Sequence, residues 1–153
     1  MKIAIVLAGV IVVAVAALVA IQPDVLKPAS LALVKKSDIF GFSPGMTFDE
    51  TSKLVTQRRY RCQGQSSYVL ACEVNGAKVT VTSDESDAQH PIRRVHAELT
   101  NPGPQDAAVK SISGQFNAQA DKDGRDGWIW IVGRGFKLSY DGSALTLVDE
   151  AKR

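Results

Sequence analysis

The sequence is poor in the residues that most often perform catalysis or bind metals. Its 153 residues include two cysteines and two histidines, and neither His90 nor His96 has the clustered ligands around it that a zinc site needs. No Gly-x-Ser-x-Gly motif, phosphate-binding loop, dinucleotide fingerprint or His-Glu-x-x-His motif occurs. We therefore predict no catalytic residue, no metal ligand, no cofactor and no small-molecule substrate, and the chain is predicted not to be an enzyme.

The sequence also lacks a strong excess of charge of either sign. Its formal net charge is +2, which creates no general field to attract nucleic acid, so no nucleic-acid partner is predicted. The hydrophobic share of 45% and the charged share of 22% are typical of globular chains and not of disordered ones. A folded domain is therefore the expectation.

Charge is absent altogether from one long stretch near the N-terminus. Ile3 to Ile21 is a run of nineteen residues without a charged or strongly polar side chain, and twelve of them are Ile, Val or Leu. As a helix the run would be about 28 Å long, close to the roughly 30 Å thickness of the hydrocarbon core of a bilayer. The sequence therefore predicts that residues 3–21 enter a membrane.

Two explanations of this run remain open. An uncleaved anchor is favoured because the run continues five residues past Ala16, which is further than a signal peptide requires. The alternative is a secretory signal with Lys2 as its basic start and a cleavage site near Ala14-Val15-Ala16. The anchor predicts a single pass of the inner membrane with a periplasmic C-terminal domain. The signal peptide predicts a periplasmic or secreted protein.

The two cysteines, Cys62 and Cys72, bear on the compartment. An even pair, close in sequence and downstream of an export element, favours one disulfide in an oxidising space. The alternative is a pair of unrelated buried thiols. Three lysines after the apolar run favour a cytoplasmic C-terminal part by the positive-inside rule. We place the domain in the periplasm because we give the cysteine pair more weight.

Three parts of the chain follow from these patterns. Residues 1–22 are the membrane span or signal peptide, and residues 23–38, which contain Pro23 and Pro28, are a connector. Residues 39–150 are long enough for one extracytoplasmic domain and too short for two comfortable ones.

Two helices are predicted in this domain. The first begins after Thr47, which forms a capping box with Glu50, and extends to about Arg59 with Phe48 on its inward face. The second follows the break at Asn101-Pro102-Gly103-Pro104 and covers Gln105 to about Ala120.

Alternation of apolar and polar residues predicts antiparallel strands after each helix. After the first helix, Cys62 and Cys72 lie opposite each other on two strands, and Asn75-Gly76 is the strongest short hairpin signal. After the second helix, residues 121–127 are predicted to be a polar loop, followed by three short strands: Trp128–Val132, Phe136–Tyr140 and Ala144–Val148. The predicted fold is α+β, with pseudo-repeats at about residues 39–100 and 104–150 forming one sheet with helices on one face.

A resemblance accompanies these patterns. Gly45-Met46-Thr47, the helix that follows, and the pair of Cys62 and Cys72 before a hairpin resemble the module of secreted β-lactamase inhibitor proteins and of the small outer-membrane-assembly lipoproteins of the SmpA/OmlA type. The resemblance implies a binding module of the bacterial envelope, with a helical start packed on an antiparallel sheet. The chain departs from the lipoproteins because no lipobox cysteine lies at the end of its apolar run. The resemblance therefore implies fold and compartment, and no functional residue.

One strand differs from the others. Trp128-Ile129-Trp130-Ile131-Val132 is apolar on both faces, whereas a strand with one open face should alternate with polar residues. The strand is either covered on both sides or presents an apolar pair to a partner, and that pair is Trp128 with Trp130 or Ile129 with Ile131. Trp128, Trp130, Arg134 and Tyr140 are the candidate partner-binding residues, because tryptophan, tyrosine and arginine dominate interaction hot spots.

These inferences together predict a non-catalytic, membrane-anchored protein of the bacterial envelope. Its periplasmic, disulfide-bonded domain is expected to bind a protein partner in an accessory or assembly role, because tethering raises the effective concentration of the domain at the membrane. The first alternative is a cleaved, secreted or periplasmic binding or inhibitor protein. The second alternative is a small envelope hydrolase with dispersed catalytic residues.

Overall fold

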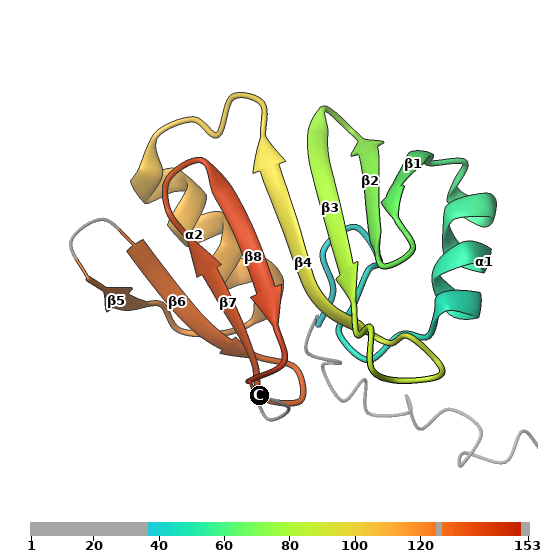
Figure 1. Cartoon of the computed structure of the whole chain (residues 1–153). Coiled ribbons are helices and arrows are strands. Elements are labelled where there is room, and N and C mark those ends of the chain that lie inside the picture. Colours follow the sequence, from blue (N-terminus) through green and yellow to red (C-terminus); the bar gives the residue numbers. More distant parts are fainter. Residues whose placement is uncertain (1–36, 125–126, 151–153) are drawn as a thin grey trace, which may run out of the picture. The chain divides into compact units, whose positions relative to one another are not determined.

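The computed structural model describes residues 37–124 and 127–150, which all belong to one compact unit (Figure 1). The predicted span at residues 3–21 and nearly all of the connector lie outside the described residues. Within the part that is described, no helix is long and apolar enough to cross a membrane.

The described chain alternates between helices and groups of strands. The helices are α1 (Phe48–Arg58) and α2 (Gln105–Phe116). The strands are β1 (Arg61–Ser66), β2 (Val69–Val74), β3 (Ala77–Ser83), β4 (Ile92–Leu99), β5 (Asp121–Asp123), β6 (Gly127–Val132), β7 (Phe136–Tyr140) and β8 (Ala144–Val148). One helix followed by four strands therefore occurs twice.

The eight strands form one antiparallel sheet in the order β1-β2-β3-β4-β8-β7-β6-β5. Each group of four is a meander, and β4 pairs with β8 where the two groups meet (Figure 1). The prediction of an α+β domain with an antiparallel sheet is confirmed. The last strand in sequence is thus one of the two central strands of the sheet.

Local sequence signals determine the first hairpins. Cys62 pairs with Cys72 in the register of β1 and β2, and their sulfurs are bonded at 2.08 Å, so the predicted disulfide is confirmed. Asn75 and Gly76 both have positive φ, 49° and 79°, as the turn favoured by right-twisted strands requires. A glycine at the second position adopts this conformation without steric cost.

The capping box of α1 is present as predicted. The Thr47 hydroxyl accepts a hydrogen bond from the Glu50 amide, and the Glu50 carboxylate accepts one from the Thr47 amide. The helix ends where Arg59 takes a left-handed conformation. The inward position predicted for Phe48 is wrong, because its side chain is 57% exposed. It is the first residue of the helix, and the face in contact with the core begins at Thr51.

The end predicted for α2 at about Ala120 is also wrong. The helix stops at Phe116 because Asn117 turns to φ 47°, ψ 50° as a left-handed C-cap. Asparagine tolerates this conformation better than most residues. Because the helix ends four residues earlier than predicted, the following residues are available to form a strand where a loop was predicted.

That strand is β5, which pairs with β6 through Asp121–Asp123. Its three side chains, Asp, Lys and Asp, are all exposed, so no apolar alternation marks it in the sequence. The prediction of a polar loop across residues 121–127 is therefore wrong at its start. Charged residues on a short end strand also oppose edge-to-edge association.

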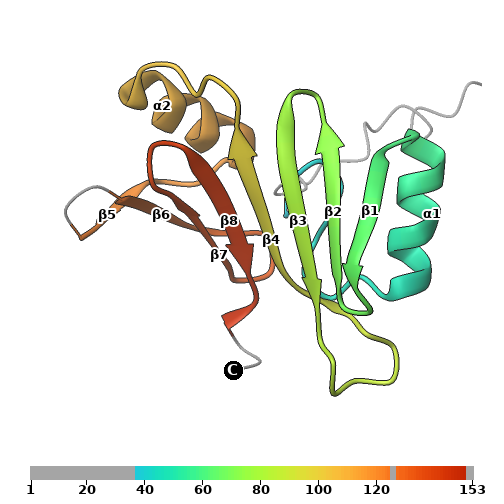
Figure 2. The ribbon, with the colours of Figure 1, turned by 45° about the horizontal axis from the view of Figure 1, so that its top comes forward.

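The core lies on one side of the sheet. Three neighbouring strands contribute fully buried side chains to it: Val79, Val95 and Leu147. The same cluster includes Ile112 and Phe116 of α2. Residues 37–46 lie behind the strands in both views, and α2 lies behind the second group of strands in Figure 1 and above it in Figure 2. Phe42 from that segment is fully buried in the cluster, and Leu54 and Val55 of α1 pack against it.

Candidate interaction surface

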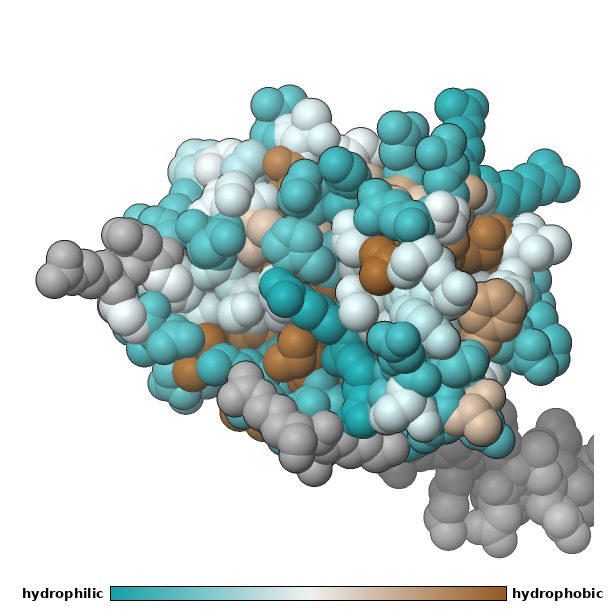
Figure 3. All heavy atoms as spheres, in the orientation of Figure 1, coloured by the Kyte–Doolittle hydropathy of each residue, from teal (hydrophilic) through white to brown (hydrophobic). Residues whose placement is uncertain are grey.

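The side of the sheet opposite the core is open to solvent. One row of side chains crosses it through all eight strands in register, and every member is exposed or half-buried: Gln63, Ala71, Thr80, His96, Thr146, Ser139, Ile129 and Asp121. Figure 3 looks onto this side and shows hydrophobic side chains scattered among polar ones. We name this side the open face.

The open face carries the apolar pair of β6. Ile131 is 60% exposed, and Ile129 in the same strand is half-buried. They lie opposite Lys137 and Ser139 of β7, so apolar and polar side chains are interleaved. Strand β6 is second from the edge and not central, and its Ile131 side is uncovered, so the explanation that the strand is covered on both sides does not hold at this residue.

Two of the four candidate binding residues lie in the core instead. Trp130 is 1% exposed, and its indole N–H donates a 2.9 Å hydrogen bond to the hydroxyl of Ser113 in α2. Tyr140 is also 1% exposed, and its hydroxyl donates to the Gly142 carbonyl oxygen at 2.9 Å. Burial, and to a lesser degree the charge of Asp141, raises the pKa of Tyr140. Both side chains are occupied in holding the fold together.

The other two candidates keep some contact with solvent. Trp128 is half-buried against the core, and the ammonium group of Lys122 in β5 lies 5.5 Å from its ring centroid, within range of a cation–π interaction. Arg134 is exposed in the turn between β6 and β7. The structure therefore does not bring the four candidates together: two lie in the core, Trp128 lies at the edge of the core, and Arg134 lies in a turn.

His96 lies near the middle of the open face, where β4 meets β8. Its Nδ1 is 2.8 Å from the Thr146 hydroxyl, and its Nε2 is 4.0 Å from the Glu98 carboxylate. The Thr146 hydroxyl connects His96 to the neighbouring strand β8, whereas Glu98 belongs to the same strand as His96.

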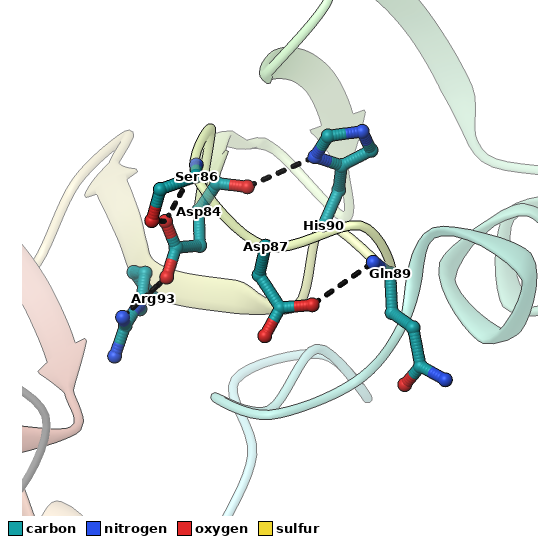
Figure 4. Close-up of polar contacts among 6 residues, drawn as sticks. All are labelled: Asp84, Ser86, Asp87, Gln89, His90 and Arg93. Atoms are coloured by element: carbon teal, nitrogen blue, oxygen red, sulfur yellow. Dashed lines mark hydrogen bonds and ion pairs between the residues drawn. The ribbon is translucent and has the colours of Figure 1, made fainter.

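A second polar cluster orders the loop between β3 and β4 (Figure 4). Asp84 accepts hydrogen bonds from the amide and hydroxyl of Ser86 and forms an ion pair with Arg93. His90 Nδ1 lies 3.0 Å from the Asp84 carbonyl oxygen, and the His90 ring contacts the Tyr68 ring edge-on at 5.1 Å. Sequence reasoning missed this cluster, because Asp84 and Arg93 are nine residues apart and only the folded loop brings them together.

These hydrogen bonds, chiefly those from Ser86, and the nearby Arg93 guanidinium lower the pKa of Asp84 to about 2. A carboxyl whose pKa falls on folding stabilises the fold above its unfolded pKa, and this stabilisation is lost as the pH falls through the folded pKa. We therefore expect part of the unfolding free energy to be lost between about pH 4 and pH 2. Urea unfolding across this range should show a shallower decline in Asp84→Asn. A decline as steep as that of the parent chain would contradict the role of this carboxyl.

The described residues contain no group of three or more His, Cys, Asp or Glu side chains that could hold a metal ion. No family model, curated protein or solved structure matches the chain. The proposals below therefore depend on the residues and their geometry.

Proposed function

We propose that this chain is a non-catalytic, membrane-anchored protein of the bacterial envelope, whose disulfide-bonded domain binds a protein partner through the open face. The observation that supports this most directly is the exposure of Ile131. Ile131 is the next-to-last residue of β6, and burying a large aliphatic side chain that is 60% exposed is favourable. Its neighbours Ile129 and Lys137 supply the mixture of apolar and polar contacts common at protein interfaces.

The dimensions of the open face suit a protein partner better than a small molecule. Eight strands at roughly 4.8 Å spacing extend over about 34 Å, and strands of three to eight residues give the face an area on the order of 600 Å². A standard interface buries about 800 Å² on each partner. The open face with its side chains approaches that size.

The compartment is inferred from two features. A disulfide persists in the periplasm and is rare in the bacterial cytosol. The apolar run at residues 3–21 supplies a route out of the cytosol, as an anchor or as a signal. N-terminal sequencing of the mature protein distinguishes these two, because an intact Met1 or Lys2 supports the anchor and a start after Ala16 supports a freely periplasmic form.

Site-specific photocrosslinking tests the partner-binding role. We expect p-benzoyl-phenylalanine at Ile131 of the full-length chain, expressed in its native cell, to give a discrete crosslinked product with a second protein. Ile131→Glu, combined with the crosslinker at Ile129, should reduce that product strongly, because a charge placed in an apolar contact must be desolvated on binding.

Phe48 provides a matched control. It is a second large hydrophobic side chain, 57% exposed, at the start of α1 and away from the open face. Crosslinker at Phe48 should give no such product, and Phe48→Glu should leave the Ile129 product intact. A product at Phe48 with none at Ile131 or Ile129 would refute the open face as the binding surface.

A further inference from the structure

A polar groove of about 870 Å³ lies at the end of the domain remote from β6. Its walls are the C-terminal end of α1, strand β1 and the hairpin that joins β2 to β3. Figure 1 shows these three elements side by side, with α1 next to β1, and Figure 2 shows the same arrangement from another angle. We call this hollow the basic groove.

The charge in the basic groove is strongly one-sided. Arg58, Arg59, Arg61 and Lys78 line it, and Glu73 is the single carboxylate among the lining residues. All five side chains are exposed, and no carboxylate of the described residues lies within ion-pair distance of the four cations. The local excess of positive charge is larger than the +2 of the whole chain, so charge complementarity favours an anionic ligand.

The position of these cations has a local cause. Arg58 is in the last turn of α1, where a positive side chain interacts favourably with the helix dipole. Arg59 is the left-handed C-cap, which turns the chain into β1 so that Arg61 follows at once. The helix dipole accounts for the position of Arg58, and the turn from α1 into β1 accounts for the positions of Arg59 and Arg61.

Uncharged groups in the basic groove match a polypeptide. β1 is the end strand of the sheet, so its outward backbone N–H and C=O groups have no neighbouring strand among the described residues. Gln63 and Gln65 of β1, and Asn75 of the hairpin, add side-chain amides that donate and accept hydrogen bonds. An extended segment carries both kinds of partner along its main chain, which a lipid headgroup lacks.

We propose that the basic groove binds an acidic, extended polypeptide segment of a partner protein. Carboxylates of the segment pair with the arginines, whose planar guanidinium groups suit bidentate contact, and its main chain hydrogen-bonds to β1. A membrane surface is a poorer ligand because the groove is concave and lined by amide groups that match a polypeptide main chain. This inference deepens the proposed function and rests on it, because Gln63 and Ala71 of the open face also line the basic groove. Ile129 and Ile131 belong to the other half of the sheet, so the two contacts can be tested separately.

Fluorescence anisotropy with the full-length chain in nonionic detergent tests the inference. The probe is a labelled decapeptide of five Glu-Thr repeats. It should bind at low salt, and Arg58→Gln/Arg61→Gln should weaken its affinity about tenfold, because each exposed ion pair contributes only modestly. Lys53→Gln/Lys110→Gln removes the same charge from exposed helix positions outside the groove and should leave the affinity unchanged.

Further probes distinguish the kind of ligand. A Lys-Thr decapeptide should not bind, and N-methylation of alternate residues of the Glu-Thr peptide should weaken binding by removing main-chain donors. The proposal is overturned if the methylated peptide binds as tightly as the unmethylated one. It is also overturned if the Arg58→Gln/Arg61→Gln and Lys53→Gln/Lys110→Gln variants lose the same amount of affinity for the Glu-Thr peptide. It is also overturned if soluble dihexanoylphosphatidylglycerol binds in an arginine-dependent manner and the peptide does not. Ile131→Glu should leave peptide binding unchanged, so failure of the Ile129 and Ile131 contact and failure of the basic groove are separate results.

Discussion

Trp130→Ala is expected to lower the free energy of unfolding by about 3–5 kcal/mol, the range typical of removing a large aromatic side chain from a packed core. Trp130 is 1% exposed and lies between the sheet and α2, so its removal leaves a cavity and an unpaired hydroxyl on Ser113. Urea unfolding of the full-length chain in nonionic detergent, followed by far-ultraviolet circular dichroism, measures the change.

The adjacent residue supplies a matched control. Ile131 points to the opposite face and is 60% exposed, so Ile131→Ala should change the unfolding free energy by less than about 1 kcal/mol. Trp130→Phe should lie between these values, because it keeps most of the packing and loses the hydrogen bond to Ser113. Similar losses in Trp130→Ala and Ile131→Ala would refute the register of β6, which determines both the core and the open face.

Removal of the disulfide has the second large effect. The bond closes a loop with a sequence separation of 10 between Cys62 and Cys72. In the chain-entropy model a loop of this size stabilises the fold by about 2–3 kcal/mol. Cys62→Ala/Cys72→Ala should lower the urea midpoint accordingly, with an additional small loss because Cys72 is buried at 2% exposure.

A reductant serves as the control for this variant. Adding tris(2-carboxyethyl)phosphine should lower the urea midpoint of the parent chain close to that of Cys62→Ala/Cys72→Ala and leave the double variant unchanged. Alkylation of intact cells before lysis extends the test to the compartment. Thiols that are alkylated at both positions would contradict a periplasmic location.

Features coded within a few residues could be predicted from the sequence. The capping box needs only Thr47 and Glu50 three residues apart, and the hairpin of β2 and β3 needs only Asn75-Gly76 between alternating strands. The cysteine pairing followed from antiparallel pairing in the preceding hairpin, that of β1 and β2. Each of these signals is local, so long-range packing cannot override it easily.

The order of the strands could not be predicted in this way. The pairing of β4 with β8 joins residues about fifty positions apart, such as His96 and Thr146, and leaves no local trace. Strand β5 was missed for a different reason, because both of its faces are exposed and its Asp-Lys-Asp sequence resembles a loop. Tertiary pairing, and not propensity, makes it a strand.

The candidate binding residues show how residue type misleads when a strand is apolar on both faces. Alternation in β6 separates Trp128 and Trp130 from Ile129 and Ile131 and does not say which pair faces the core. Helix α2 favours the tryptophan pair on the core side, because Ser113 of this helix accepts a hydrogen bond from the Trp130 indole N–H. Hot-spot statistics favoured the tryptophans, whereas the need of a buried indole for a hydrogen-bond partner explains why Trp130 is in the core.

The central position of β8 has a consequence for how this domain is made. Its residues, Ala144–Val148, are synthesised after the other seven strands that the structure describes and pair on both sides, with β4 and β7. Until they emerge, the two meanders have bare inner edges and no shared backbone ladder. The sheet therefore reaches its final form only when the end of the second meander is available. A nonsense mutation that removes only β8 should divide the molecule into two halves that expose strand edges to proteolysis and aggregation.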